Sequence, residues 1–74
     1  MSKFIRIPIQ SSLITSVAHD DFSNVLEIVF REGGIYEYAD FSEKKFRKFL
    51  GSRSIGKFFN DKIRKNHRYR KVRF

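Results

Sequence analysis

The sequence predicts a small α+β domain, in which an antiparallel meander of three to four strands precedes two short helices packed on one face. Three observations lead to this fold class. Apolar residues alternate along the first half of the chain, two adjacent glycines interrupt the alternation, and the apolar spacing lengthens to three and four residues after position 40. Alternation is typical of strands and the longer spacing of helices. A chain of 74 residues is expected to form a single domain, residues 1–74.

The first two strands are expected near the N-terminus. The segment FIRIPI, residues 4–9, alternates, and its three isoleucines share one face. Pro8 has no N–H to donate to a neighbouring strand, which favours an edge position. Residues 11–20 alternate more weakly, and the polar residues 20–24 predict a turn after them. In this interpretation His19 is a surface or edge residue.

A hairpin is expected next. Residues 25–30, VLEIVF, predict a firm strand, and residues 35–39, IYEYA, predict its partner. The glycines of the connection REGG, residues 31–34, supply the positive φ angles that tight hairpin turns require. Successive side chains of a strand point to opposite faces, so Tyr36 and Tyr38 are expected side by side on one face.

The first helix is predicted in residues 40–51, DFSEKKFRKFLG, where phenylalanines and a leucine recur at helical spacing. Ser42 suits the N-cap, and Gly51 is a natural stop. Phe41, directly before the cap, is expected to pack on Phe46 as a hydrophobic staple.

A second helix is expected to begin near Ser52 or Ser54 and to end near Asn66. Its apolar stripe recurs every four residues at Ile55, Phe59 and Ile63. Gly56 weakens a helix interior, which places it in the first turn or at a close backbone approach. The remaining residues, 67–74, alternate like a short strand or an extended tail.

The positive charge is concentrated in the last quarter of the chain. Residues 57–74 hold eight cations and one acid, a net charge of +7, whereas residues 1–56 hold eight cations and seven acids, a net charge of +1. This asymmetry favours an anionic partner, meaning nucleic acid, an acidic protein face or a membrane surface. Of these partners a membrane surface is the least favoured, because the core requires the apolar residues of the second helix and leaves little to insert into a membrane.

Composition argues against several other classes. The chain has no cysteine and only two histidines without paired ligand spacing, so we expect neither a metal site nor a cofactor. No apolar run approaches the roughly 20 residues of a membrane span, and the first residues lack a signal core, so a cytoplasmic location is expected. Ser11, Ser12, His19 and Asp20 could supply a hydrolase triad, but so small a domain has little room for its pocket, and we expect no enzyme.

Two features indicate a nucleic-acid interface. The tyrosine pair predicts either a stacking platform for unpaired bases or rings that cover the core. The basic segment favours an anion-binding surface over a solvated coat, because arginine offers planar forks to phosphate. The candidate nucleic-acid-binding residues are Lys57, Lys62, Arg64, Lys65, Arg68, Tyr69, Arg70, Lys71 and Arg73, with Tyr36 and Tyr38.

Four short motifs, taken in order, resemble the KTSC domain, a small module named for its occurrence at the C-terminus of some lysyl-tRNA synthetases. They are IQSSLI at 9–14, Tyr-Glu-Tyr at 36–38, SIGKFFN at 54–60 and Ile-Arg at 63–64. The resemblance spans about residues 7–70, and the order and spacing of the motifs make it fairly specific. KTSC domains also occur as standalone proteins of bacteria and their phages.

The resemblance implies a compact α+β fold and an RNA-binding role, without an established enzymatic activity. The positions that it implies are Ser11, Ser12, Tyr36, Tyr38, Ser54, Gly56, Phe59 and Asn60. We expect Ser54, Gly56 and Asn60 to serve capping and packing.

The chain departs from the family's usual pattern at three places. His19 stands where an aromatic residue usually precedes the aspartate of the first turn. Residues 41–42, Phe-Ser, replace a usual Val-Pro, and the basic C-terminal extension, residues 65–74, goes beyond the pattern.

The leading hypothesis is therefore a small non-enzymatic domain that binds nucleic acid through residues 57–73. RNA is favoured over DNA as its ligand. The alternative is a phage-encoded regulator that docks on a host machine such as RNA polymerase. Such a protein would offer the edge strand at 4–9 for strand addition and its basic end to an acidic protein surface.

Overall fold

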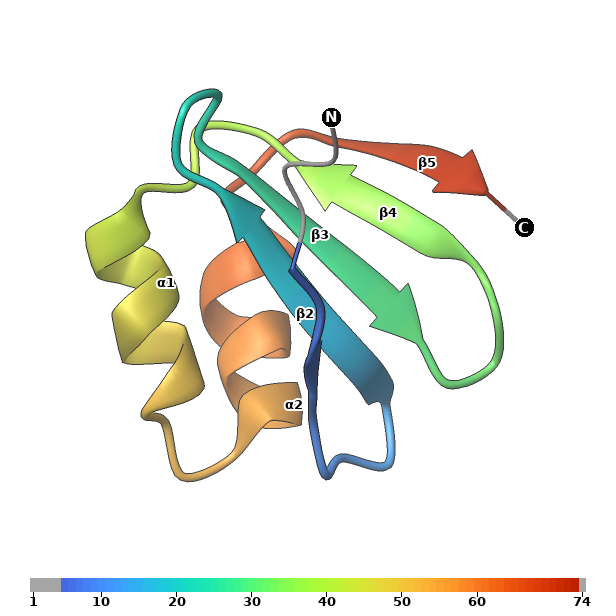
Figure 1. Cartoon of the computed structure of the whole chain (residues 1–74). Helices are drawn as coiled ribbons and strands as arrows, with labels where there is room; N and C mark the ends of the chain where they lie inside the picture. Colours follow the sequence, from blue (N-terminus) through green and yellow to red (C-terminus); the bar gives the residue numbers. More distant parts are fainter. Residues whose placement is uncertain (1–4, 74) are drawn as a thin grey trace.

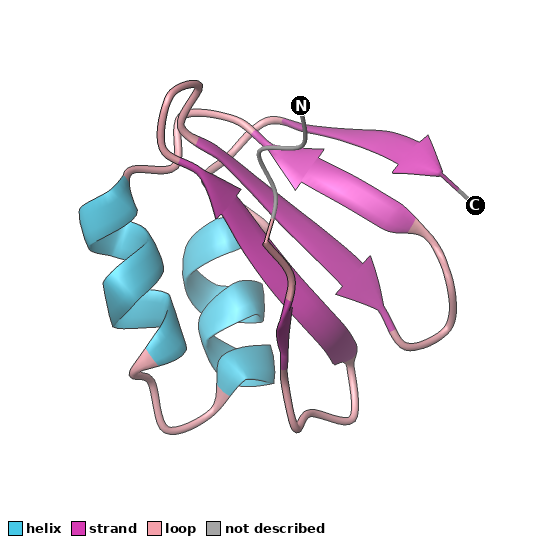
Figure 2. Cartoon of the chain, viewed as in Figure 1, coloured by secondary structure: helices cyan, strands magenta, loops and turns pink. Residues whose placement is uncertain are grey.

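The structure of the protein is a computed structural model that describes residues 5–73 (Figure 1). Five antiparallel strands form one sheet, in the spatial order in which they follow along the chain. The strands are β1 (Ile7–Pro8), β2 (Ile14–Asp20), β3 (Val25–Phe30), β4 (Ile35–Tyr38) and β5 (Tyr69–Arg73). The helices are α1 (Glu43–Leu50) and α2 (Ile55–Phe58), which continues directly as the π-helical turn η1 (Phe59–Ile63). Both helices cover the same face of the sheet, as predicted (Figure 2).

The sheet has five strands instead of the predicted three to four, because the C-terminal segment, expected as a short strand or an extended tail, joins the sheet. The C-terminal segment is the full strand β5, which pairs with β4 and places Tyr69 opposite Tyr38. At the other edge, Ile7 and Pro8 pair with β2, so the expected edge position is confirmed. The paired part is shorter than the predicted segment, in which residue 4 lies outside the described residues.

The turns form where the sequence predicts them, and side chains hold one of them. Gly33 and Gly34 have φ angles of 105° and 91° in the connection between β3 and β4. After β2, the Asp20 carboxylate accepts hydrogen bonds from the Phe22 backbone N–H and the Ser23 hydroxyl, both at 2.9 Å. Asn24 completes that turn with a φ of 55°.

The core lies between the sheet and the two helices. Its buried residues are Ile14, Val17, Leu26, Ile28, Phe30, Tyr38, Phe41, Phe46, Phe49, Phe59 and Ile63. Serines cap both helices, since Ser42 Oγ accepts from the Lys45 N–H and Ser54 Oγ accepts from the Lys57 N–H. Within residues 5–73, no helix is long and apolar enough to cross a membrane.

His19 is buried, and its predicted position at the surface is wrong. The side chain is 1 % exposed, and the ring stacks on Phe46 with centroids 5.0 Å apart. Nδ1 lies 2.7 Å from the Asp21 carboxylate, and Nε2 contacts the Phe41 carbonyl oxygen. Since the Phe41 carbonyl oxygen can only accept, Nε2 is the donor of that hydrogen bond, which ties the buried ring to the segment before α1.

Candidate nucleic-acid interface

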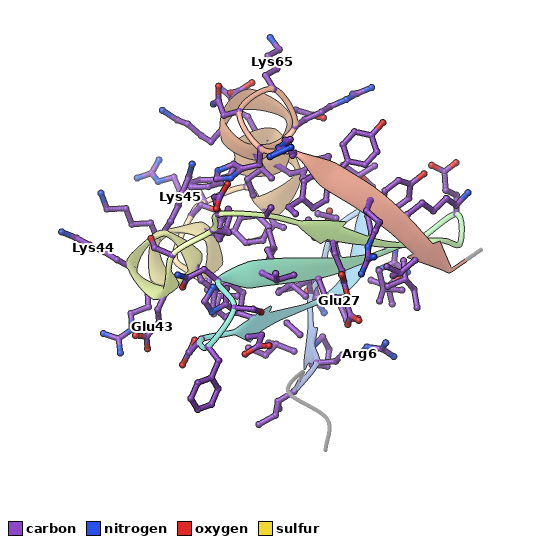
Figure 3. The ribbon with its side chains drawn as sticks, turned by 90° about the horizontal axis from the view of Figure 1, so that it is seen from above. Arg6, Glu27, Glu43, Lys44, Lys45 and Lys65 are labelled. Atoms are coloured by element: carbon purple, nitrogen blue, oxygen red, sulfur yellow. The ribbon has the colours of Figure 1, made fainter. Side chains whose placement is uncertain are left out.

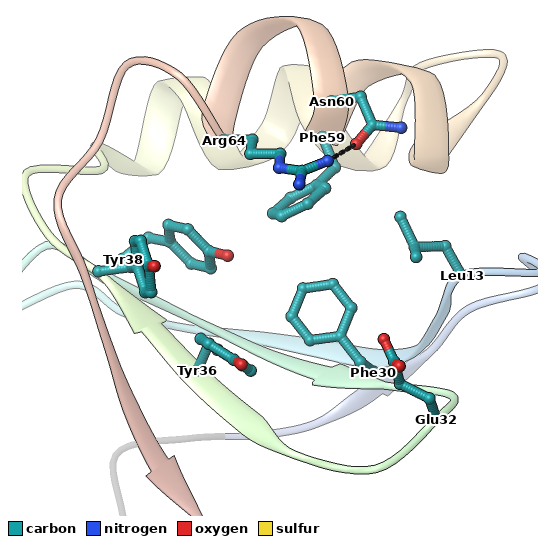
Figure 4. Close-up of a pocket in the computed structure, with 9 residues that line it drawn as sticks. Leu13, Phe30, Glu32, Tyr36, Tyr38, Phe59, Asn60 and Arg64 are labelled. Carbon is teal, nitrogen blue, oxygen red and sulfur yellow. Dashed lines mark hydrogen bonds between the residues drawn. The ribbon is translucent and has the colours of Figure 1, made fainter.

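An open cleft of about 260 Å³ lies between the sheet and η1 (Figure 4). We call it the aromatic cleft. Its lining residues are Leu13, Phe30, Glu32, Tyr36, Tyr38, Phe59, Asn60, Arg64 and Tyr69. Rings and a leucine thus form its walls, while a carboxylate, an amide and a guanidinium provide polar groups. Apolar walls with a few polar groups are typical of ligand-binding clefts.

Edge-to-face ring contacts fix the inner walls of the aromatic cleft. Phe30 contacts Tyr36 and Phe59, in both cases with ring centroids 5.3 Å apart. Tyr38 contacts Phe59 with centroids 5.5 Å apart and an interplanar angle of 81°. Such contacts are favourable beyond the area that they bury, so the walls are held in place before any ligand arrives.

The tyrosines differ in exposure. Tyr36 and Tyr38 share one face of β4, as predicted, but only the half-buried Tyr36 borders solvent, because Tyr38 is 4 % exposed. Tyr38 therefore fits the alternative interpretation, in which its ring fills the core. The exposed ring belongs to Tyr69, which is 62 % exposed and has its centroid 5.7 Å from those of both other tyrosines.

The electrostatics of the cleft follow from this burial. Burial, together with the neighbouring Tyr36 and Tyr69, raises the pKa of Tyr38 to about 12, whereas the positive charge of Arg64 opposes the shift. The Tyr38 hydroxyl therefore stays neutral and gives the neighbouring Arg64 no negative charge.

The π-helical turn directs polar side chains into the cleft. Its defining hydrogen bond runs from the Arg64 N–H to the Phe59 carbonyl at 2.9 Å. Phe59 stays in the core, while the Arg64 guanidinium reaches the Asn60 Oδ1 at 3.5 Å on the rim (Figure 4). At the β5 side, the Lys71 ammonium lies 5.7 Å from the centroid of the Tyr36 ring, within range of a cation–π interaction. Single π-helical turns are frequent at functional sites.

The other predicted cations whose side chains are described do not line the aromatic cleft. Arg70 lies on the opposite face of the sheet, where it donates to Glu37 at 3.1 Å. Lys62 faces α1 rather than the cleft. Lys65 and Arg68 are exposed in the segment between η1 and β5, where Lys65 points away from the body (Figure 3). Lys57 lines a hollow beside Ser54 and Asp61.

One predicted residue is only partly described. The Arg73 backbone pairs with Ile35, and its side chain lies outside the described part of the chain. Among residues 5–73, no group of three or more His, Asp or Glu side chains is placed to hold a metal ion.

The positions implied by the family resemblance divide between the fold and the cleft. Ser11 Oγ accepts from the backbone N–H groups of Leu13 and Ile14, so it holds the turn before β2. Ser54 caps α2, and Gly56 packs in its first turn, where an added Cβ would lie 3.6 Å from Ser11 Oγ. These two roles agree with the expectation. Asn60 differs, because its exposed side chain lines the aromatic cleft.

Sequence reasoning missed Glu32 and the phenylalanine walls of the cleft, as well as three lysines of α1. Phe30 and Phe59 carry ordinary core patterns, and nothing local marks them as cleft residues. Glu32 sits in the predicted hairpin turn, where an acid is common. The lysines, Lys44, Lys45 and Lys48, fall in the part of the chain whose net charge is only +1.

The fold and the cleft define a class of protein: a small α+β domain in which a five-stranded sheet carries two helices on one face and an open aromatic cleft lies between the sheet and η1. Residues 10–69 match the KTSC domain family, and the chain belongs to that family. The predicted resemblance is thereby confirmed.

A solved structure and a sequence relative agree with this assignment. The crystal structure of a KTSC domain protein from Yersinia pestis superimposes with a TM-score of 0.89 at 36 % identity, covering 93 % of this chain and 97 % of that chain. An uncharacterized protein from Stutzerimonas stutzeri is 29 % identical over 62 residues, which are 84 % of this chain and 87 % of that protein.

Proposed function

We propose that the protein binds single-stranded nucleic acid, RNA before DNA, with one base against Tyr69 and Tyr36 and the sugar–phosphate backbone along the neighbouring cations. The observation that carries the proposal is the meeting of an exposed tyrosine and an arginine at one aromatic cleft. A base stacked on an aromatic side chain contributes about 1–3 kcal/mol. A guanidinium presents a planar fork of donors to phosphate.

The charge distribution supports a polyanionic ligand. Arg64, Lys65 and Arg68 follow one another around the end of η1, and none of them forms an ion pair with a carboxylate of the described residues. Unpaired cations beside an aromatic cleft are the arrangement by which proteins follow a single strand. The amide of Asn60 and the carboxylate of Glu32 offer partners for a 2′-hydroxyl, which is why RNA is placed before DNA.

The salt dependence of RNA binding tests the electrostatic part of the proposal. Neutralising about five phosphates of a single strand gives a log–log slope of affinity against salt near −3.5. We expect R64A/R68A to flatten this slope by about 1.4, since two contacts are lost. The matched control is R70A, which removes a cation already paired with Glu37 on the opposite face. Binding that ignores salt, or an R70A effect as large as that of R64A/R68A, contradicts the proposal.

Conservative changes at Tyr69 test the stacking part. Tyr69→Phe keeps the ring and is expected to bind a single-stranded RNA 12-mer as tightly as wild type. Tyr69→Leu keeps apolar cover over Tyr38 but removes the ring, so affinity is expected to fall about tenfold. Circular dichroism checks that both variants fold. Equal affinities of the two variants for the RNA would contradict the proposal that a base stacks in the aromatic cleft.

The alternative, a regulator that docks on a host protein such as RNA polymerase, would use an edge strand. Only two residues of β1 are paired, and β5 is rich in lysine and arginine, which discourage strand addition. We therefore place nucleic acid first. A pull-down from nuclease-treated bacterial lysate separates the two functions, because a stoichiometric protein partner that survives the nuclease would favour the regulator.

A further inference from the structure

A second concave surface, of about 430 Å³, lies between α1 and η1. We call it the lysine groove. Its lining residues are Ser42, Lys44, Lys45, Lys48, Phe58 and Lys62. Four lysines from two helices thus line one hollow, together with a phenylalanine and a serine.

Within residues 5–73, no carboxylate forms an ion pair with a lysine of the groove. Glu43, the acid of α1, is occupied by Arg47, whose guanidinium donates to it at 3.0 Å. No ion pair joins Lys44, Lys48 or Lys62 to any carboxylate in the described part of the chain. Like charges four residues apart on a helix repel, so this arrangement costs stability unless an anion occupies the groove.

The inner wall of the lysine groove is held in place by Lys45. Its ammonium donates to the His67 Nε2 at 2.7 Å and lies 5.4 Å from the centroid of the Phe41 ring. His67 in turn donates from Nδ1 to the Ala39 carbonyl at 2.9 Å. The groove is thereby fastened to the segment that leads into β5.

One helix separates the lysine groove from the aromatic cleft. In the continuous run of α2 and η1, Phe58 and Lys62 face the groove, whereas Asn60 and Arg64 face the cleft. Lys65 projects from the end of the same run (Figure 3). A strand with a base in the aromatic cleft can therefore continue over this end of the helix to the groove, meeting cations along the way.

We propose that the lysine groove binds phosphate groups in the backbone of the single strand whose base occupies the aromatic cleft. The inference rests on the proposed function and extends it to a second site with its own ligand chemistry. Lysine ammonium groups suit this task because they attract phosphate as point charges without reading a base. A carboxylate-rich peptide is the competing occupant, and the experiment distinguishes it.

The experiment compares two variants of the same helix in binding to a single-stranded RNA 12-mer at 0.1 M salt. K44Q/K48Q removes two cations of the groove. Each lost contact with a single strand is worth about fivefold at this salt concentration, so affinity should fall about 25-fold and the salt slope by about 1.4. R47Q, which removes the paired cation between them in sequence, is expected to change affinity less than twofold.

A trinucleotide and an abasic deoxyribose-phosphate 12-mer separate the two sites. The trinucleotide occupies the aromatic cleft alone, so K44Q/K48Q should bind it like wild type. The abasic oligomer has phosphates without bases, so it should shift the backbone amide signals of Lys44, Lys48 and Lys62 more than those of Tyr36 and Tyr69.

The possible outcomes assign failure to one proposal or the other. If K44Q/K48Q weakens 12-mer binding no more than R47Q does, while Tyr69→Leu and R64A/R68A weaken it as expected, the groove inference is overturned and the proposed function stands. If none of these variants weakens binding, both fail. Displacement of the abasic oligomer from the groove by oligoglutamate at equal charge concentration would overturn phosphate as the occupant.

Discussion

Tyr69 of β5 lies directly opposite Tyr38 of β4, with ring centroids 5.7 Å apart and ring planes inclined by 35°. This pair makes the C-terminal strand part of the fold and of the aromatic cleft at once. One face of β5 carries Tyr69 and Lys71 toward the cleft, while Arg70 points to Glu37 on the other face. The basic end of the chain is therefore a structural strand whose two faces have different roles.

Two arginine–glutamate pairs lie on the face of the sheet opposite the helices, and they differ in the burial of the glutamate. We therefore expect R6A and R70A to differ in stability. Arg6 bonds both carboxylate oxygens of Glu27, at 2.9 and 3.4 Å, and the Glu27 side chain is only 7 % exposed (Figure 3). This hydrogen bonding and the charge of Glu27 raise the pKa of the Arg6 guanidinium. R6A leaves a buried carboxylate without its partner, so we expect a loss of about 1–3 kcal/mol in urea denaturation.

The matched control for this prediction is R70A. Arg70 is 75 % exposed and its partner Glu37 is 23 % exposed. An exposed pair contributes about 0–1 kcal/mol, so R70A should unfold nearly like wild type. Equal losses in R6A and R70A would show that the burial of Glu27 does not decide the outcome.

Two variants separate the contribution of the His19 ring contacts to stability from that of its hydrogen bonds. His19→Phe keeps a ring against Phe46 but leaves the Phe41 carbonyl without its donor, so we expect a loss of about 1–3 kcal/mol in thermal or urea unfolding. Asp21→Ala removes the other partner, which is 65 % exposed, and should cost less than about 1 kcal/mol. A His19→Phe variant as stable as wild type would mean that stacking alone holds this position.

Local signals predicted most of the fold, because they act within a few residues. The serine caps at Ser42 and Ser54 and the Gly33–Gly34 turn each depend on a backbone geometry next to them in the chain. The pairing of Tyr69 with Tyr38 depends instead on two helices returning the chain to the sheet, and periodicity carries no such information. The alternation of residues 67–74 therefore allowed a short strand or a tail, but it could not predict the pairing of this strand with β4 or the outer wall of the cleft.

The lysine groove escaped prediction for a different physical reason. The net charge of residues 1–56 is only +1, so this part of the chain looks neutral in sequence. In the structure, Glu27 and Glu37 are engaged by arginines on the far face of the sheet, away from the helices. The net charge of a segment therefore does not show where its charges lie, and the lysines of α1 form no ion pair with a carboxylate of the described residues.

At Gly56 we expect a small side chain to be tolerated and a large side chain to destabilise the protein. In Gly56→Ala, the new Cβ would meet Ser11 Oγ at 3.6 Å and the Leu13 Cβ at 3.9 Å, which are ordinary contact distances. Alanine also loses less backbone entropy on folding, so we expect a gain of about 0.5–1 kcal/mol. Gly56→Leu should instead cost about 1–3 kcal/mol by displacing the Ser11 turn. Urea denaturation measures both, and a destabilised Gly56→Ala would contradict the assigned packing.

Tyr38 predicts how stability falls at alkaline pH. Burial is the main cause that raises its pKa from 10.0 to about 12 in the folded protein, whereas the unfolded chain keeps the ordinary value. Between these values the folded state holds the proton more tightly, so the stabilisation is fully present below pH 10 and is lost as the pH rises toward 12. Two pKa units correspond to a loss of up to about 2–3 kcal/mol.

Tyr38→Phe removes this ionisation and keeps the ring, which makes the contacts of Tyr38 with Phe59 and Tyr69. We expect the variant to match wild type at pH 8 and to lose less stability between pH 10 and 11, measured by urea denaturation. Tyr69→Phe, which changes an exposed ring, serves as the control and should keep the wild-type alkaline loss. If Tyr38→Phe and Tyr69→Phe lose stability equally over this range, the alkaline loss does not originate in the burial of Tyr38.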